Sequence, residues 1–229
     1  MATFICLHGA GGWGADWDLV AADLRRLGHE VVAPDLPADD EDAGLAEHTA
    51  AVVDAIGDRT GGLVLVAQSL SGFVAPLVCT QVAVDLMVLV AAMVPLPGET
   101  AAEWWAATGQ PEAQEALGLP DDSPETVFLH DVPADVLAAH PVPRPPADGF
   151  FDEPWPLSAW PGVPTRFLAC RDDRLFPERW LRGVVRDRLG IEADEAPGGH
   201  CAYLSAPGPL AAAIAACWDE QATRATMGA

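Results

Sequence analysis

One short stretch constrains this chain more than any other: an apolar run that ends in a serine. Residues 63–66 are continuously apolar, which predicts a strand buried on both faces, as in a parallel sheet. Ser69 follows, and the small residues Ala67 and Ser71 flank it two positions away. A sharp strand-to-helix turn that presents a nucleophilic serine needs small residues there. Gly72 comes one residue later than the usual G-x-S-x-G pattern requires. A serine after a strand often only caps a helix, so this stretch alone leaves open both a catalytic serine and a helix cap.

Strands and helices are expected to alternate on either side of this stretch. Apolar runs predict strands, and apolar residues spaced three or four apart predict helices. The alternation indicates an α/β fold with a mostly parallel central sheet and helices on both faces. The expected strands are residues 3–7, 29–33, 63–66, 86–90, 165–169 and 191–195, and the expected helices are residues 16–27, 45–56, 70–82, 177–189 and 209–222.

The segment 93–164 differs from both flanks because prolines crowd it and break any regular sheet. We expect two short helices within it, at residues 100–108 and 133–139, in an otherwise irregular cap. Its aromatic residues supply too much apolar surface for a disordered linker. The chain is therefore expected to divide into an α/β core, residues 1–92 and 165–229, and a lid insertion, residues 93–164.

Charge excludes several classes of partner. The chain carries 34 Asp and Glu against 12 basic residues, a formal net charge of −22, and every basic residue is Arg. Such a charge repels nucleic acids and anionic membrane surfaces, so neither is expected as a partner. No apolar run is long enough to span a membrane, and the first expected strand leaves no room for a signal peptide. Five cysteines without metal-ligand spacing fit reduced thiols, and we expect a cytoplasmic protein.

Two further polar residues form a set with Ser69. Asp173 lies just after the fifth expected strand, and His200 lies in the loop after the last one. All three positions fall at the carboxyl ends of strands, one edge of a parallel sheet, where open α/β folds place their sites. A serine hydroxyl becomes a nucleophile when an imidazole takes its proton and a carboxylate orients that imidazole. The N–H groups of Leu70, at a helix start, and of Ala10, in a glycine-rich turn, are candidates for the required oxyanion hole.

These pieces resemble the α/β-hydrolase superfamily, and within it the small cofactor-free members that include plant methyl esterases and hydroxynitrile lyases. The resemblance implies that Ser69 is the nucleophile, His200 the general base and acid, and Asp173 the residue that orients it. It also implies oxyanion donors at Ala10 and Leu70, a cap that serves as a lid, and no cofactor or metal. The matching residues span nearly the whole chain: His8-Gly9-Ala10, Pro34-Asp35-Leu36-Pro37, the Ser69 turn, Ala91-Ala92-Met93-Val94-Pro95, Asp173 and Gly199-His200.

Two departures from the family pattern bear on the reaction. Ser71 stands where the family usually has Gly, and a serine side chain should still fit the turn. Hydroxynitrile lyases of this family carry Lys directly after the catalytic His, where this chain has Cys201, which argues against cyanohydrin cleavage. We therefore expect a serine hydrolase that cleaves a small or medium carboxylic ester through an acyl-enzyme.

Two other functions remain open on the same fold. A cofactor-free lyase, cyclase or isomerase of a specialised pathway would use Ser69 or His200 as a base without an acyl-enzyme. A non-catalytic receptor would bind its ligand without turnover. The expected partner in each case is a small hydrophobic molecule, and the sequence leaves open whether the chain forms a homodimer.

A dinucleotide site is a further alternative. Residues 9–14 match G-x-G-x-x-G between an expected strand and helix, and Asp35 ends the next strand, where such folds place the acid that binds ribose. Asp16 and Asp18 count against it, because they would repel a pyrophosphate at the helix N-terminus. A reductase of this kind would also leave the serine, aspartate and histidine set unexplained.

Several side chains have a structural interpretation beside a functional one. Ser71 is the rival nucleophile, but bulky Phe73 follows it two positions on, where the turn needs a small residue. Asp172 is the rival of Asp173 and is expected at the surface, and His8 is expected to make structural hydrogen bonds. No role is expected for four histidines placed at the surface or in the lid: His29, His48, His130 and His140. The residues expected either to line a substrate pocket or to pack in the core are Trp13, Gln68, Met93, Trp104, Trp105 and Phe176.

Overall fold

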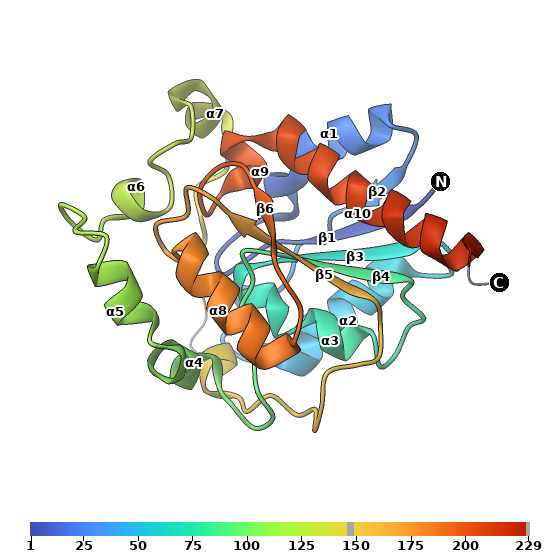
Figure 1. Ribbon diagram of the computed structural model, residues 1–229, viewed down its shortest axis with the longest axis horizontal. Coiled ribbons are helices and arrows are strands. Elements are labelled where there is room, and N and C mark those ends of the chain that lie inside the picture. Colours follow the sequence, from blue (N-terminus) through green and yellow to red (C-terminus); the bar gives the residue numbers. More distant parts are fainter. Residues whose placement is uncertain (146–148, 228–229) are drawn as a thin grey trace.

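One sheet, parallel throughout, lies at the centre of the protein. The structure, a computed structural model, describes residues 1–145 and 149–227. The order of its strands is β2-β1-β3-β4-β5-β6, so β3 lies between β1 and β4 (Figure 1). All five neighbouring pairs are parallel, which brings the carboxyl ends of the strands to one edge and confirms the predicted α/β class. The strands are β1 (Thr3–Leu7), β2 (Glu30–Val32), β3 (Leu63–Gln68), β4 (Leu86–Val90), β5 (Thr165–Cys170) and β6 (Asp194–Ala196).

Helices cover both faces of this sheet. The helical elements of the core are η1 (Gly14–Trp17), α1 (Asp18–Arg26), α2 (Leu45–Ile56), η2 (Ser69–Gly72), α3 (Ala75–Val78), α8 (Glu178–Leu189), α9 (Ala202–Ser205) and α10 (Pro207–Met227). On one face α1 packs against α10, with α9 beside them. On the other face lie α2, α3 and α8 (Figure 1).

The continuous apolar runs of the strands supply two cores, one for each face. In β1, Phe4 and Cys6 pack towards α1 and α10, whereas Ile5 and Leu7 pack towards α2, α3 and α8. All four side chains are fully buried. Strands that are buried on both faces read as unbroken apolar sequence, which explains why the central strands were predictable from their apolar runs.

The connection between β4 and β5 lies over the carboxyl edge of the sheet and carries most of the irregular structure (Figure 1). Trp104 and Trp155 are buried within it, and the Trp155 indole N–H donates to the Phe73 carbonyl of the core at 3.0 Å. Residues 146–148 of the predicted lid and residues 228–229 of the predicted core lie outside the described residues. The elements of this β4–β5 connection are α4 (Ala101–Thr108), α5 (Gln110–Glu115), α6 (Pro124–Val127), α7 (Ala134–Ala139) and η3 (Gly149–Asp152).

Element boundaries differ from the predictions where proline or a tight turn intervenes. The helix predicted over residues 70–82 is η2 followed by the single turn α3, because Pro76 has no N–H to continue one helix from the serine onwards. The helix predicted over residues 16–27 begins as the 3-10 turn η1, and β6 starts three residues later than predicted. Two missed helices, α5 and α6, both carry Pro in the first turn, and in α6 a Ser123 cap precedes it, a recognisable start signal.

The five cysteines are free thiols, and four of them are buried. Burial raises the pKa of the Cys201 thiol to about 12, so this residue beside His200 stays protonated at neutral pH. Among residues 1–145 and 149–227, no three His, Cys, Asp or Glu side chains converge as metal ligands would. Within the same residues, no helix has both the length and the apolar composition needed to cross a bilayer.

Candidate active site

Ser69 sits on a strained turn directly after β3. Its φ of 52° lies in the left-handed region, which a residue with a side chain rarely adopts. Its carbonyl accepts a hydrogen bond from the Met93 N–H at 2.9 Å, which ties the turn to the segment that follows β4. A Cβ on Gly72 would overlap the Met93 carbonyl oxygen, so glycine is needed at this position. In the usual G-x-S-x-G pattern, the second glycine stands two residues after the serine. Here the close backbone approach falls at Gly72, three residues after Ser69, so position 71 can carry a serine side chain.

Ser69, His200 and Asp173 form a continuous chain of hydrogen bonds. The Ser69 Oγ lies 3.0 Å from His200 Nε2, and His200 Nδ1 lies 2.9 Å from Asp173 Oδ2. An ionised carboxylate only accepts, so Nδ1 carries the ring proton and Nε2 presents a lone pair to the serine hydroxyl. This is the tautomer that a general base for serine requires. All three residues are buried.

Backbone groups fix the carboxylate of Asp173. Its second oxygen, Oδ1, accepts from the amides of Leu175 and Phe176 at 2.8 and 2.9 Å. The rival Asp172 is exposed, and its side chain pairs with Arg171 at the surface. The two backbone donors leave Oδ2 as the oxygen that meets the imidazole, so the loop after β5 selects between the two aspartates.

The loop that carries His200 is anchored on both sides. The Gln68 amide donates to the His200 carbonyl at 3.1 Å, and the Gly199 N–H donates to Asp131 of the β4–β5 connection at 2.6 Å. The Phe176 ring meets the imidazole edge-on, with 5.0 Å between ring centroids. Gln68 and Phe176, predicted as pocket residues, therefore position the imidazole in this structure.

The two predicted oxyanion donors lie together beside the serine. Ala10 follows Gly9 in the turn after β1. A Cβ on Gly9 would lie 2.9 Å from Ser69 Cβ, so this turn can approach the serine closely only because residue 9 is glycine. Among the described residues, neither the Ala10 N–H nor the Leu70 N–H has a hydrogen-bond acceptor. Two unpaired backbone donors near a nucleophile can stabilise a developing oxyanion.

His8 makes the structural hydrogen bonds that were predicted for it. Its Nδ1 donates to the Gly9 carbonyl at 2.8 Å, and its Nε2 accepts from the Leu36 N–H at 3.0 Å. Burial lowers the pKa of His8 to about 4, so the ring stays neutral at pH 7. The Ser71 Oγ donates to the His8 carbonyl at 2.5 Å, which commits the rival serine to a structural bond.

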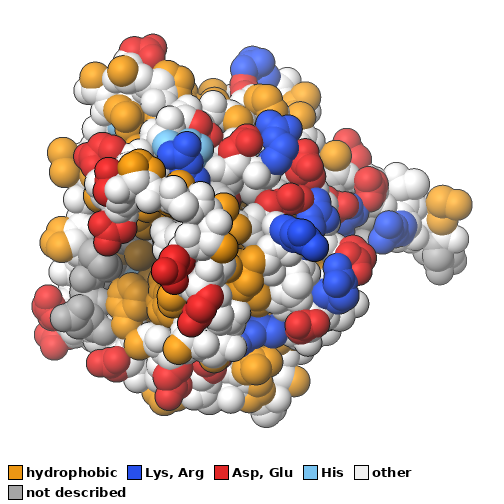
Figure 2. Space-filling model, turned by 60° about the vertical axis from the view of Figure 1, so that its left-hand side comes forward, with side chains coloured by type: hydrophobic (Ala, Val, Ile, Leu, Met, Phe, Trp, Pro, Cys, Tyr) orange, Lys and Arg blue, Asp and Glu red, His pale blue; other side chains and the backbone are white. Residues whose placement is uncertain are grey.

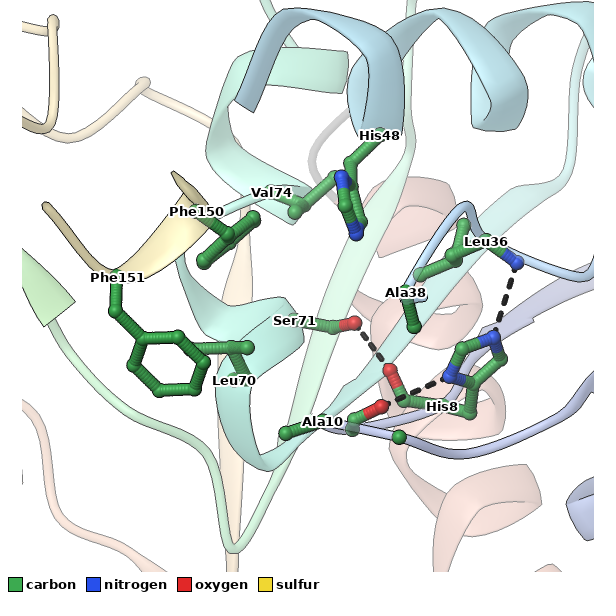
Figure 3. Close-up of a pocket in the computed structure, with 12 residues that line it drawn as sticks. His8, Ala10, Leu36, Ala38, His48, Leu70, Ser71, Val74, Phe150 and Phe151 are labelled. Carbon is green, nitrogen blue, oxygen red and sulfur yellow. Dashed lines mark hydrogen bonds between the residues drawn. The ribbon is translucent and has the colours of Figure 1, made fainter. Parts of the chain in front are cut away.

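A small pocket, partly open to solvent, lies next to the oxyanion donors. His48 reaches into it from α2 towards Ala38 and Ser71, and Ala10 lies on the opposite side (Figure 3). Hydrophobic side chains gather around a hollow at this end of the molecule, and acidic side chains lie about its margin (Figure 2). The lining residues are His8, Gly9, Ala10, Gly11, Leu36, Ala38, His48, Leu70, Ser71, Val74, Phe150 and Phe151.

The predicted pocket residues do not line this cavity. Trp104 is fully buried and donates to the Val94 carbonyl at 3.1 Å, and its ring packs against Trp105 and Phe176. Trp13 donates to the Val142 carbonyl at 2.9 Å. The indole N–H groups of Trp13 and Trp104 thus each find a backbone partner within the fold, as buried tryptophans usually do.

His48 is the clearest correction to the sequence analysis. It was predicted at the surface or in the lid without a role, yet it is only 5% exposed and faces the pocket. Its position was readable, because it lies three residues after Leu45 and four before Val52 on the buried face of α2. Phe150 and Phe151 had no comparable signal, because they lie on η3, a turn without periodicity.

The glycine-rich turn is not arranged for a dinucleotide. The Gly14 N–H at the start of η1 donates to Asp35 Oδ1 at 2.6 Å. Asp35, the residue that would bind the ribose, therefore already takes an amide that a pyrophosphate would need. A Cβ on Gly11 would overlap the Arg144 carbonyl, which shows how closely the β4–β5 connection covers the turn. The G-x-G-x-x-G match therefore reflects close backbone packing.

Comparison with known proteins points to one family. The sequence matches the model described as the alpha/beta hydrolase family over residues 4–213. No curated protein matches it by sequence.

Solved structures share the fold at low sequence identity. A pyrethroid hydrolase from Sphingobium faniae JZ-2 superposes with a TM-score of 0.74 at 23% identity, covering 95% of this chain and 97% of that chain. Polyneuridine aldehyde esterase gives 0.77 at 18% identity, with 94% and 98% covered. A methylesterase from Arabidopsis gives 0.73 at 16% identity, with 94% and 98% covered.

Proposed function

This chain belongs to the α/β-hydrolase family, and we propose that it is a serine hydrolase that cleaves a small or medium carboxylic ester. The observation that carries the proposal is the hydrogen-bonded chain from Ser69 through His200 to Asp173. The similarity in fold to proteins named as esterases and a pyrethroid hydrolase supports an ester as substrate.

The reaction proceeds in two steps with one proton carrier. His200 Nε2 takes the hydroxyl proton as Ser69 Oγ attacks the ester carbonyl, and the Ala10 and Leu70 amides hold the oxyanion. His200 then gives the proton to the leaving alcohol, and an acyl-enzyme remains on Ser69. Water, deprotonated by the same imidazole, then attacks the acyl group, and His200 returns this proton to Ser69 Oγ as the acid is released. Asp173 stabilises the imidazolium in both steps.

The β4–β5 connection serves as the lid of this site in our proposal. Asp131 from this segment holds the loop of His200, and Phe150 and Phe151 line the pocket. Its contacts with both ends of the site support a role in shaping the substrate cavity and in excluding water.

A covalent probe tests the proposal. We expect a fluorophosphonate to label the protein once, on Ser69, and Ser69→Ala to abolish both labelling and hydrolysis of p-nitrophenyl acetate. The exposed Ser158 provides a matched control, since Ser158→Ala should label and turn over like the unmodified protein. Undiminished turnover by Ser69→Ala would rule out the proposal.

A further inference from the structure

The pocket next to the oxyanion donors lies on the acyl side of the proposed reaction. The leaving alcohol must lie near His200 Nε2 to receive its proton. The pocket includes Ala10 and Leu70 but neither His200 nor the rings that pack on it, Phe128 and Phe176. An ester bound with its carbonyl oxygen at the two amides therefore places its acyl group in the pocket and its alcohol on the other side. This assignment rests on the proposed function.

Most of the pocket surface is apolar. In the part of the chain that the structure describes, no Asp, Glu, Arg or Lys lines the pocket. Such a surface favours an uncharged hydrocarbon body, because burying an unpaired charge costs several kcal/mol. The apolar lining consists of Leu36, Ala38, Leu70, Val74, Phe150 and Phe151.

His48 adds one specific polar feature to this surface. Its Nδ1 lies 2.8 Å from the Gly44 carbonyl, and a carbonyl only accepts, so Nδ1 carries the ring proton. The other nitrogen, Nε2, is then an acceptor, and it has no hydrogen-bond partner among the described residues. Burial lowers the pKa of His48, which keeps this lone pair available at neutral pH. The ring is held in place edge-on by Phe150, with 4.8 Å between centroids.

The neighbouring polar groups cannot supply His48 with a donor. The Ser71 hydroxyl hydrogen is used on the His8 carbonyl, so Ser71 offers only acceptor lone pairs to the pocket. Both ring nitrogens of His8 are already paired, with Gly9 and Leu36. Apart from the Ala10 and Leu70 amides, which the ester carbonyl takes, the described side chains of the pocket thus present only acceptors on an apolar surface, and the acyl group must bring the donor.

We propose that the substrate's acyl group carries a hydroxyl, which donates a hydrogen bond to His48 Nε2 inside this pocket. Among the described lining residues, a carboxylate or phosphate would find no cation to pair with, and an ammonium group would find no carboxylate. A hydroxyl on a short aliphatic or aromatic acyl group satisfies both the acceptor and the apolar surface. His48 is in this account a specificity-determining residue, which binds the acyl group without moving a proton.

Matched p-nitrophenyl esters test the proposal. The pairs are butanoate against 3-hydroxybutanoate, and 3-phenylpropanoate against 3-(4-hydroxyphenyl)propanoate. The measured quantity is the ratio of kcat/KM for the hydroxylated ester to that for its parent. We expect a ratio of about 10 in at least one pair, the effect of one hydrogen bond to a buried acceptor. His48→Phe should reduce that ratio to about 1, and His48→Gln, which keeps an acceptor oxygen, should preserve part of it.

His29 offers the matched control, because it is a histidine at the opposite edge of the sheet, where its Nδ1 accepts from the Ala2 N–H. His29→Phe should leave the ratio unchanged. A ratio near 1 in both pairs for the unmodified protein, or one that survives His48→Phe, overturns the proposal. Turnover of p-nitrophenyl acetate that depends on Ser69 would in that case still support the hydrolase, so the two proposals fail separately.

Discussion

At the scale of single residues, Ser69 combines the reacting hydroxyl with a strained backbone. Its φ of 52° costs a residue with a Cβ on the order of 1 kcal/mol, a cost that glycine does not bear. We predict that Ser69→Gly has a free energy of unfolding about 1 kcal/mol higher than that of Ser69→Ala, while both lack turnover. Urea unfolding of the two variants measures this difference. Equal stabilities would show that the turn stores no strain.

His8 makes the stability of the fold depend on pH. Its folded-state pKa of about 4 lies below the ordinary value of 6.5, so between these values the unfolded chain binds a proton that the folded chain does not. Stability from the neutral ring is therefore complete above pH 6.5 and is lost as the pH falls towards 4. The loss is about 1.4 kcal/mol for each pH unit in that window.

His8→Gln isolates this effect, since other titrating groups are common to both proteins. We predict that the stability advantage of the unmodified protein over His8→Gln shrinks by about 2 kcal/mol between pH 6.5 and pH 5. Chemical unfolding at a series of pH values gives the difference directly. A difference that stays constant with pH would mean that the pKa of His8 is the same in the folded and unfolded states.

At the scale of elements, Arg144 fastens the β4–β5 connection to the turn that carries Ala10. Its backbone N–H donates to the Gly11 carbonyl at 2.7 Å, its Nε to the Gly12 carbonyl at 3.1 Å, and its guanidinium lies 4.0 Å from the Trp13 ring centroid. One side chain thus fixes the turn by hydrogen bonds and by stacking, which the planar guanidinium can do and an ammonium cannot.

We predict that Arg144→Met lowers kcat by about 10- to 100-fold with a smaller effect on KM, because a displaced oxyanion amide weakens transition-state binding. The kcat of Arg144→Lys should lie between that of the unmodified protein and that of Arg144→Met. Steady-state kinetics with p-nitrophenyl acetate provide the test, and Arg59→Met, at an exposed pair with Glu30, is the control. If Arg144→Met lowers kcat no more than Arg59→Met does, Arg144 does not position the oxyanion amide.

Element boundaries show where sequence reasoning stops. The helix 45–56 and the strand 86–90 were predicted to the residue, because glycine follows the helix and an unbroken apolar run defines the strand. The helix after Ser69 was predicted as one element over residues 70–82, whereas the structure has η2 and then the short α3, with Pro76 in its first turn. In the β4–β5 connection, short turns held by tertiary contacts carry no periodic pattern, so η3 and its pocket residues were missed.

At the scale of the whole molecule, the order of parallel strands brings three distant residues to one edge. Asp173 and His200 follow β5 and β6, and Ser69 follows the central β3, so the parallel register alone places them near each other. That is why the set was predictable from strand ends. The pocket was not, because His48 and Phe150 approach from separate layers, and only the packed fold brings their rings within 4.8 Å.

The central claim is that this edge holds a serine able to carry an acyl group. The most direct measurement is the intact mass of the protein, acid-quenched during its reaction with p-nitrophenyl acetate, followed by peptide mapping. We predict a transient mass increase by one acetyl group, located on Ser69 and absent from Ser69→Ala. Ester hydrolysis that proceeds with no acyl group on Ser69 at any time, or with the group on another residue, would contradict it.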